Sequence, residues 1–236
     1  MANSENQLDH LRHSCAHLLA AAVIDIWPTV LRTIGPSIDN GFYFDFDFGS
    51  TKISEDDLSK IEARMHELAK SWKDFASREV TPTQAKDIYK DNPYKLELID
   101  EFSSQSQKLT IYKSGEYEDL CRGGHVDNPA QSLKYFKLLS LAGAYWRGDE
   151  KNPMLTRVYG AAFQTKKDLE NCLWQQEEAK KRDHRILGER LKLFAFAEEV
   201  GPGLPLWLPA GTIIREEIEK RAKEVERQWG YERVAT

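Results

Sequence analysis

Two short motifs in the sequence combine histidine and cysteine at close spacing. His13 and His17 are four residues apart in a segment with helical periodicity, so both imidazoles would lie on one face of a helix, one turn apart. Cys121 and His125 are separated by Arg-Gly-Gly, and the two glycines would let the backbone turn sharply or approach a ligand closely. Two such pairs favour one shared site over two unrelated packing arrangements, so we expect the four side chains to converge.

Several kinds of chemistry are open to such a cluster. Three imidazoles and a thiolate could complete a tetrahedral zinc shell. Without a metal, the same groups could hydrogen bond a substrate and move a proton to or from a water molecule. A Cys–His nucleophile pair ranks lower, because nothing in the sequence marks Cys121 as activated. The spacing does not separate metal-dependent from metal-free chemistry, and a buried structural cysteine is the alternative without function.

Two further charged residues are candidates for the same site. Asp119 is two residues before Cys121, so in a strand both side chains would point to one face, where a carboxylate could bind a substrate ammonium group. Lys95 is a candidate cation, although the sequence alone favours a solvated lysine there. A local basic cluster, which could contact nucleic-acid phosphates, consists of Lys180, Lys181, Arg182 and Arg185.

The first half of the chain must position the histidine pair. Periodic apolar residues predict a helix from about residue 8 to residue 27, ended by Pro28. Its histidine face also carries Ala20 and Ile24, so we expect this face to border a cleft beside a sheet, with the opposite face in the core. Alternation predicts a half-buried strand over residues 42–48, and an apolar stripe predicts a second helix over residues 54–75.

The second half of the chain is predicted to contain strands and helices, followed by helices alone. We expect a short strand, a helix after Pro82 and a turn at residues 92–93, and then one β-sheet formed from residues 108–163. A charged helix should follow over residues 165–193, with one more helix over residues 214–229. The pattern predicts an α+β fold in which an antiparallel sheet packs with helices, followed by a helical linker.

Composition limits the classes of protein that fit. The 236 residues are 41% apolar and 30% charged, a balance typical of a globular protein. No apolar run reaches the roughly 18 residues of a membrane span, and the first residues do not resemble a secretory signal. Three cysteines do not form a disulfide framework, so we expect a cytoplasmic protein. The net charge of −5 means that nucleic acid would need a local basic patch.

Longer stretches of the chain resemble the editing domain of threonyl-tRNA synthetases, which is related to the alanyl-tRNA editing proteins. The chain departs from some relatives at Phe44, where they have tyrosine, and at Gly124, where they have proline. The resemblance implies a polar leader, an editing domain, a linker helix and the start of a class II catalytic domain, with boundaries at residues 1–7, 8–164, 165–193 and 194–236. The stretches that carry it are residues 12–23, 34–47, 118–126, 136–160 and 177–194.

The resemblance implies an aminoacyl-tRNA deacylase that acts in proofreading during protein biosynthesis. Serine and threonine differ by one methyl group, which supplies only about 1–3 kcal/mol of discrimination, so a synthetase that misloads serine needs a second, hydrolytic site. The substrate would be the acceptor end of tRNA(Thr) carrying serine. By resemblance, His13 and Lys95 activate water and stabilise charge, and Asp119 anchors the substrate. The residues that shape the pocket and hold the adenosine would be His17, Cys121 and His125.

Cofactors and partners follow from the same resemblance. Editing would require no cofactor, although zinc at the four histidine and cysteine residues stays open. ATP and the catalytic zinc belong to the part of the family enzyme beyond residue 236, so we expect no aminoacylation by this chain, and the full-length enzyme is expected to be a homodimer. The alternatives are a non-catalytic fragment that holds the tRNA acceptor end through the basic cluster, and a zinc-dependent hydrolase of another small ester or amide.

Overall fold

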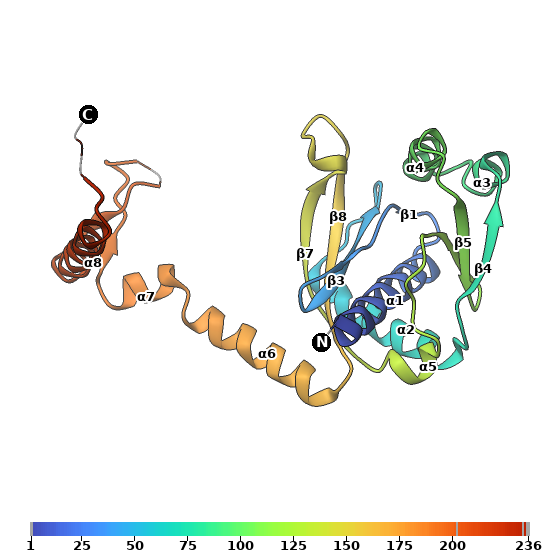
Figure 1. The fold of residues 1–236 in the computed structure, drawn as a ribbon, viewed down its shortest axis with the longest axis horizontal. Helices are drawn as coiled ribbons and strands as arrows, with labels where there is room; N and C mark the ends of the chain where they lie inside the picture. Colours follow the sequence, from blue (N-terminus) through green and yellow to red (C-terminus); the bar gives the residue numbers. More distant parts are fainter. Residues whose placement is uncertain (1, 202, 233, 235–236) are drawn as a thin grey trace. The chain divides into compact units, whose positions relative to one another are not determined.

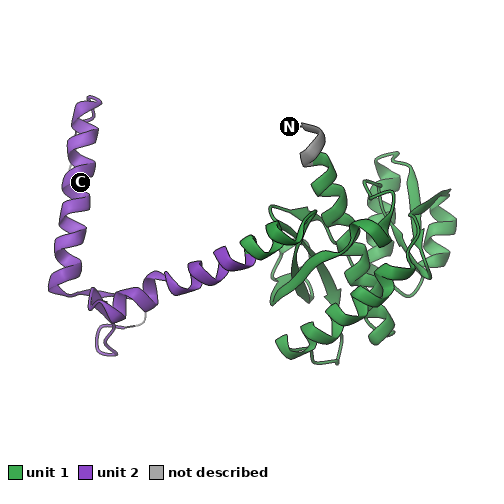
Figure 2. Cartoon of the chain, turned by 90° about the horizontal axis from the view of Figure 1, so that it is seen from below, with its two compact units in different colours: residues 1–172 green, residues 173–236 purple. Residues whose placement is uncertain are grey.

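The computed structural model describes residues 2–201, 203–232 and 234. Residues 1, 202, 233, 235 and 236, which belong to the expected leader and C-terminal segment, lie outside the described residues. The chain divides into two compact units, residues 1–172 and 173–236, and each is described by itself (Figure 2). The first unit combines antiparallel sheets with helices, which confirms the expected α+β class.

The larger sheet of the first unit has the strand order β1-β3-β8-β7, with β2 also paired to β3. All its pairings are antiparallel. The expected strand over residues 42–48 is β3, and its alternating phenylalanines are buried as predicted. The strands are β1 (Leu31–Arg32), β2 (Ser37–Ile38), β3 (Gly41–Asp47), β7 (Tyr135–Tyr145) and β8 (Met154–Phe163).

A second, three-stranded antiparallel sheet has the order β4-β5-β6. Its strands are β4 (Ala76–Val80), β5 (Leu109–Ser114) and β6 (Tyr117–Leu120). The expectation of a single sheet over residues 108–163 was therefore wrong. Two glycines with positive φ, Gly123 and Gly124, and the short helix α5 (Pro129–Ser132) carry the chain from one sheet to the other. Alternation along a strand does not specify its partner strand, and that is why the sequence did not reveal the division.

Helix α1 (Ala2–Ile26) runs between the two sheets (Figure 1). It packs on β2, β3 and β8 of the larger sheet and on α2 (Leu58–Ser71), and the ring of its His17 contacts Tyr117 of β6. The residues from Leu11 to Val23 are buried almost all round, which confirms that this helix has protein on both faces. Its backbone is already helical at Ala2, before the expected start at residue 8.

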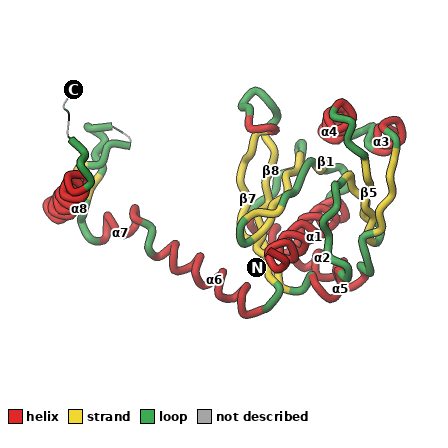
Figure 3. The backbone as a smooth tube through the Cα atoms, viewed as in Figure 1, coloured by secondary structure: helices red, strands yellow, loops and turns green. Residues whose placement is uncertain are grey.

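Two helices lie at one end of the strands of the smaller sheet (Figure 3). Helix α3 (Pro82–Ile88) is the one expected after Pro82. The expected turn at residues 92–93 instead begins α4 (Pro93–Ser104). The side chain of Asn92 caps this helix by accepting a hydrogen bond from the backbone nitrogen of Lys95 at 3.1 Å. An Asn-Pro pair is typical of a turn and also of a helix start, where asparagine is the N-cap and proline the first helical residue. Here it begins a helix.

The remaining helices come after β8 in the sequence. The expected helix over residues 165–193 is divided into α6 (Lys166–Lys181) and α7 (His184–Arg190), because Asp183 caps the second helix through the backbone nitrogen of Arg185. Two short strands, β9 (Phe194–Ala195) and β10 (Leu206–Trp207), pair with each other before α8 (Pro209–Gln228). Within the described residues no helix has the length and apolar character that crossing a membrane would need.

Candidate active site

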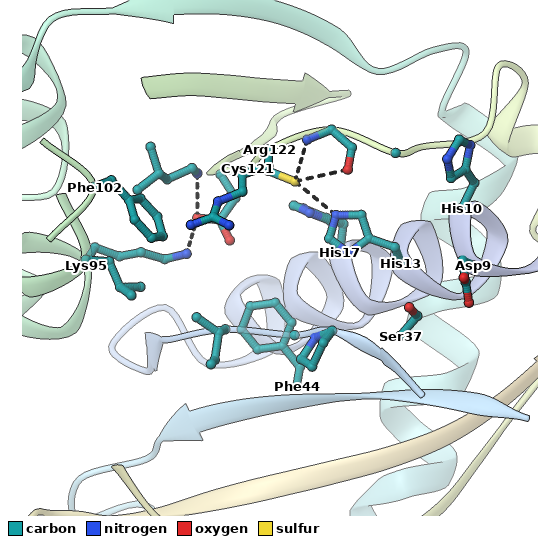
Figure 4. Close-up of a pocket in the computed structure, with 18 residues that line it drawn as sticks. Asp9, His10, His13, His17, Ser37, Phe44, Lys95, Phe102, Cys121 and Arg122 are labelled. Atoms are coloured by element: carbon teal, nitrogen blue, oxygen red, sulfur yellow. Dashed lines mark hydrogen bonds and ion pairs between the residues drawn. The ribbon is translucent and has the colours of Figure 1, made fainter. Parts of the chain in front are cut away.

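A pocket of about 480 Å³ opens in the first unit beside α1. Its walls come from α1, the loop at residues 34–37, β3, α4 and the segment at residues 119–124 (Figure 4). These segments are far apart in the sequence, and the pocket exists only where the two sheets and α1 meet. The candidate residues that line it are His13, His17, Lys95, Asp119 and Cys121.

The two motifs meet at this pocket, which confirms the expected convergence. The Nε2 atom of His13 lies 2.9 Å from the Sγ atom of Cys121, and Sγ lies 3.6 Å from Nε2 of His125. The His17 ring centroid is 4.8 Å from those of both other histidines. The four side chains therefore form one contact cluster, and its contact between His13 and Cys121 joins residues 108 positions apart in the sequence.

His125 departs from the expectation that all four side chains line the pocket. It is absent from the pocket wall and faces two neighbouring hollows instead. Its ring is stacked between Phe75, at a centroid distance of 4.1 Å, and His13, at 4.8 Å. Because these rings cover both faces of the imidazole, His125 does not line the pocket. It packs against the His13 ring instead.

Glycine holds the loop of the second motif in place. Gly123 has φ 95° and Gly124 has φ 84°, a backbone conformation that favours glycine. A Cβ atom on Gly123 would lie 2.6 Å from the hydroxyl oxygen of Tyr112, and the backbone nitrogen of Gly123 donates to Cys121 Sγ at 3.3 Å. A side chain at residue 123 would therefore displace the loop that fixes the thiol.

The cluster is uncharged at neutral pH. Burial lowers the pKa of His13 and lowers that of His17 well below the ordinary value. Burial, together with the neighbouring His13 and His10, lowers the pKa of His125 to about 3. Burial also raises the pKa of the Cys121 thiol to about 11, so this cysteine is a thiol and not a ready nucleophile.

The pKa of His125 predicts acid destabilisation. In the folded chain it is about 3, below the ordinary 6.5, so between these values the unfolded chain binds more protons and stability falls as the pH falls. The thermal midpoint should therefore decline below about pH 6.5, and less steeply in His125→Gln than in the unaltered chain. Thermal unfolding at pH 7, 6, 5 and 4 measures this, with exposed His184→Gln as control. Equal slopes in all three proteins would contradict it.

Lys95 and Asp119 form a buried ion pair at the pocket wall. Lys95 Nζ lies 2.7 Å from Asp119 Oδ1, and both side chains are 2% exposed. The interpretation of Lys95 as a solvated lysine was wrong, because the Asn92 cap turns the first turn of α4 inward. Burial lowers the pKa of Lys95, and the attraction of Asp119 opposes that change. Burial alone would raise the pKa of Asp119, but the charges of Lys95 and Arg32 outweigh it and hold that pKa below its usual range.

The Asp119 carboxylate accepts several hydrogen bonds from within the protein. The backbone nitrogen of Leu120 donates to Oδ1 at 2.8 Å, and the Tyr117 hydroxyl donates to Oδ2 at 2.9 Å. Arg32 Nε also donates to Oδ1, at 3.3 Å. An ionised carboxylate has about four acceptor sites, and Lys95 together with these three donors already fills them, so the Asp119 carboxylate mainly binds its protein neighbours.

Arg32 lies outside the pocket lining but contacts Asp119, and the motifs did not reveal it. Its guanidinium carbon lies 5.3 Å from the ring centroid of Tyr89 and 5.5 Å from that of Tyr117. Its NH2 group donates to the Glu118 carbonyl at 3.0 Å, and its own carbonyl accepts from the Asn92 side chain at 2.9 Å. Arg32 thus joins β1, β6 and the start of α4. The only sequence signal was a single charged residue in the stretch TVLRTIG.

The four histidine and cysteine residues are compatible with a metal ion. The atoms that could ligate it all lie within 4.8 Å of one another. The 2.9 Å between His13 Nε2 and Cys121 Sγ is shorter than the roughly 3.5 Å that separates two ligands of a tetrahedral zinc ion, so these two side chains would have to move apart. The Nδ1 atoms of His17 and His125 are buried without a hydrogen-bond partner, whereas ligating histidines usually donate their second nitrogen.

The predicted basic cluster lies on α6 and α7 in the second unit. Each of its four exposed cations has an acidic neighbour. Lys180 pairs with Glu177, Lys181 and Arg182 pair with Glu178, and Arg185 pairs with Asp183. The positive charge of the cluster is therefore partly offset on the same helices.

Residues 109–159 match the family model described as "Threonyl and Alanyl tRNA synthetase second additional domain". The threonine–tRNA ligase of Flavobacterium psychrophilum is 49% identical over 224 residues, which are 95% of this chain and 34% of that protein. The threonine–tRNA ligase of Rubrobacter xylanophilus is 49% identical over 236 residues, 100% of this chain and 36% of that protein. That of Streptococcus mutans is 48% identical over 232 residues, or 98% and 36% respectively.

The chain thus spans about a third of the length of the curated relatives that it matches. The matched segment contains β5, β6 and the loop with Cys121 and His125, and therefore half of the side-chain cluster at the pocket. By the matched domain and by identity to these ligases, the chain belongs to the threonyl-tRNA synthetase family, and it includes that family's editing region.

Proposed function

We propose that this chain hydrolyses the ester bond between serine and the 3′ end of tRNA(Thr). The observation that carries the proposal is the placement of His13, an uncharged base, in the same pocket as the buried cation Lys95. Hydrolysis of an ester needs a group that accepts a proton from water and a positive charge near the developing oxyanion. The family relationship supports an RNA substrate that carries an amino acid.

The proposed reaction begins at His13. A water molecule that takes the place of the Cys121 thiol at Nε2 of His13 gives its proton to that nitrogen, the water oxygen attacks the ester carbonyl, and Lys95 stabilises the tetrahedral oxyanion. The protonated His13 then gives its proton to the 3′ oxygen as the carbon–oxygen bond breaks, which releases serine and a free ribose hydroxyl. Before the water enters, Cys121 orients His13 through the contact between Sγ and Nε2. Asp119 holds Lys95 in position.

Preference for serine over threonine would come from the tightness of the pocket wall. A Cβ atom on Gly35 would lie 2.1 Å from the ring of Phe44, so the loop and β3 are in direct contact beside the pocket. Packed walls exclude an added methyl group because they cannot make room without strain. We propose that the extra methyl of threonine is rejected in this way.

Incubation of the chain with seryl-tRNA(Thr) and with threonyl-tRNA(Thr) tests the function. We expect rapid release of serine and slow release of threonine. Binding of the tRNA without faster serine release would contradict the proposal and support the alternative of a non-catalytic fragment that holds the acceptor end. Release of both amino acids at one rate would contradict the proposed discrimination.

A second candidate, a zinc-dependent hydrolase, is favoured by the closeness of the four potential ligand atoms. On the metal-free proposal, we expect serine release to survive a chelator, because a neutral imidazole and Lys95 supply the proton transfer and the charge. Metal analysis of the purified chain, with activity measured before and after chelation and after addition of zinc, separates the two. Loss of activity on chelation and its return with zinc would favour the metal-dependent enzyme.

A further inference from the structure

One arginine at the pocket has a guanidinium group without an ion-pair partner among the described residues. Arg122 lines the pocket next to Cys121 and is exposed. Its guanidinium carbon lies 4.5 Å from the ring centroid of Phe102, another pocket residue. Among the ion pairs of the described residues none includes Arg122.

The other cations of this region are already engaged. Lys95 and Arg32 both bind Asp119. Arg78 of the same sheet pairs with Glu118 at 3.0 Å. Arg122 therefore presents the one side chain of this wall that combines a fixed positive charge with unoccupied donors facing a cavity. The Phe102 ring restricts the guanidinium plane without using its hydrogen-bond donors, which prepares it for a ligand.

The surroundings favour an anion beside Arg122. The guanidinium fork matches a phosphate or carboxylate, to which it donates two parallel hydrogen bonds. The one exposed carboxylate of the pocket, Asp9, lies with His10 at the opposite end from Phe102 (Figure 4). Repulsion from Asp9 would therefore act far from the ligand on Arg122.

We propose that Arg122, supported by Phe102, binds the phosphate of the 3′-terminal nucleotide of the aminoacylated RNA. The inference rests on the proposed function. An ester of that nucleotide's ribose placed at His13 leaves its phosphate one ribose away, and Arg122 is one residue from Cys121, which contacts His13. Arg122 is a binding residue and does not contact the ester.

The test compares two substrates that differ only in the phosphate, the 3′-seryl ester of adenosine and the same ester of adenosine 5′-monophosphate. In Arg122→Gln we expect KM for the phosphorylated ester to rise about tenfold, the size of one charge-assisted contact, with kcat unchanged. For the phosphate-free ester we expect no change in either constant. Arg122→Lys should fall between, because it keeps the charge and loses the fork.

Arg64→Gln is the matched control, since Arg64 lies on α2 and pairs with Asp25 and Glu67 away from this pocket. An equal rise in KM for both esters in Arg122→Gln would mean that the arginine supports the pocket structure. An unchanged KM for both esters would mean that the phosphate binds elsewhere. Either result overturns the inference.

Binding measured by calorimetry keeps the inference separate from the proposed function. The ligands are the non-hydrolysable seryl amide analogues of the two esters. If the unaltered chain releases no serine from seryl-tRNA(Thr), the proposed function fails. The inference still stands if the chain binds the phosphorylated analogue more tightly and Arg122→Gln removes the difference, and it fails if the chain binds both analogues equally.

Discussion

Replacing His13 by alanine is expected to lower the rate of seryl ester hydrolysis by about 10²–10⁴-fold, the usual contribution of a general base. His13 lines the pocket, and burial keeps its pKa below the ordinary value, so its imidazole is uncharged at neutral pH. The rate of the unaltered chain should be constant around neutral pH and fall as the pH drops through this lowered pKa, because protonated His13 cannot act as a base.

The measurement is single-turnover release of serine from seryl-tRNA(Thr), with thermal unfolding of each protein to establish that the variant is folded. His184→Ala is the matched control, because that histidine is exposed on α7 in the second unit. A folded His13→Ala protein with near-native turnover would exclude His13 as the base. A rate that increases towards acid pH would do the same.

The convergence of the two motifs was predictable because each is a local pattern. Four-residue spacing places His13 and His17 on one helix face whatever the tertiary structure, and a glycine pair marks a sharp turn next to Cys121. The only tertiary assumption was that two such motifs share a site. The contact between His13 and Cys121 confirms it.

The other features of the site depend on packing that no local pattern records. Lys95 is buried because a capped helix, rather than a turn, begins at Pro93. Arg32 is held beside Asp119 between Tyr89 and Tyr117, which come from distant elements. Division of residues 108–163 into two sheets likewise depends on strand partners, which alternation does not specify.

Replacing Lys95 by methionine is expected to lower serine release by about 10²–10³-fold, as removal of one oxyanion-stabilising donor does. Methionine keeps most of the volume and removes the charge. The variant should also lose about 3–5 kcal/mol of stability, because it leaves the buried Asp119 without its nearest cation. Serine release and urea unfolding of the same preparation measure the two effects.

Asp119→Asn separates two roles for this carboxylate. If Asp119 only holds Lys95, the variant should lose stability by a similar amount, since Lys95 and Arg32 would face each other without a counter-charge. Its discrimination between seryl and threonyl esters should stay unchanged. If Asp119 anchors the substrate ammonium, KM for both esters should rise and the discrimination should weaken.

The double variant Lys95→Met with Asp119→Asn distinguishes catalysis from folding. Removing both charges leaves neither of the two positions with an unpaired buried ion, and only Arg32, which is 20% exposed, loses its carboxylate partner. The double variant should therefore be more stable than the sum of the two single losses implies, a coupling expected of groups in contact at 2.7 Å. Its serine release should nevertheless stay as low as that of Lys95→Met, because the cation beside the oxyanion is still missing. Recovery of activity together with stability would show that Lys95 matters only for the fold, and additive stability losses would show that the two residues act independently.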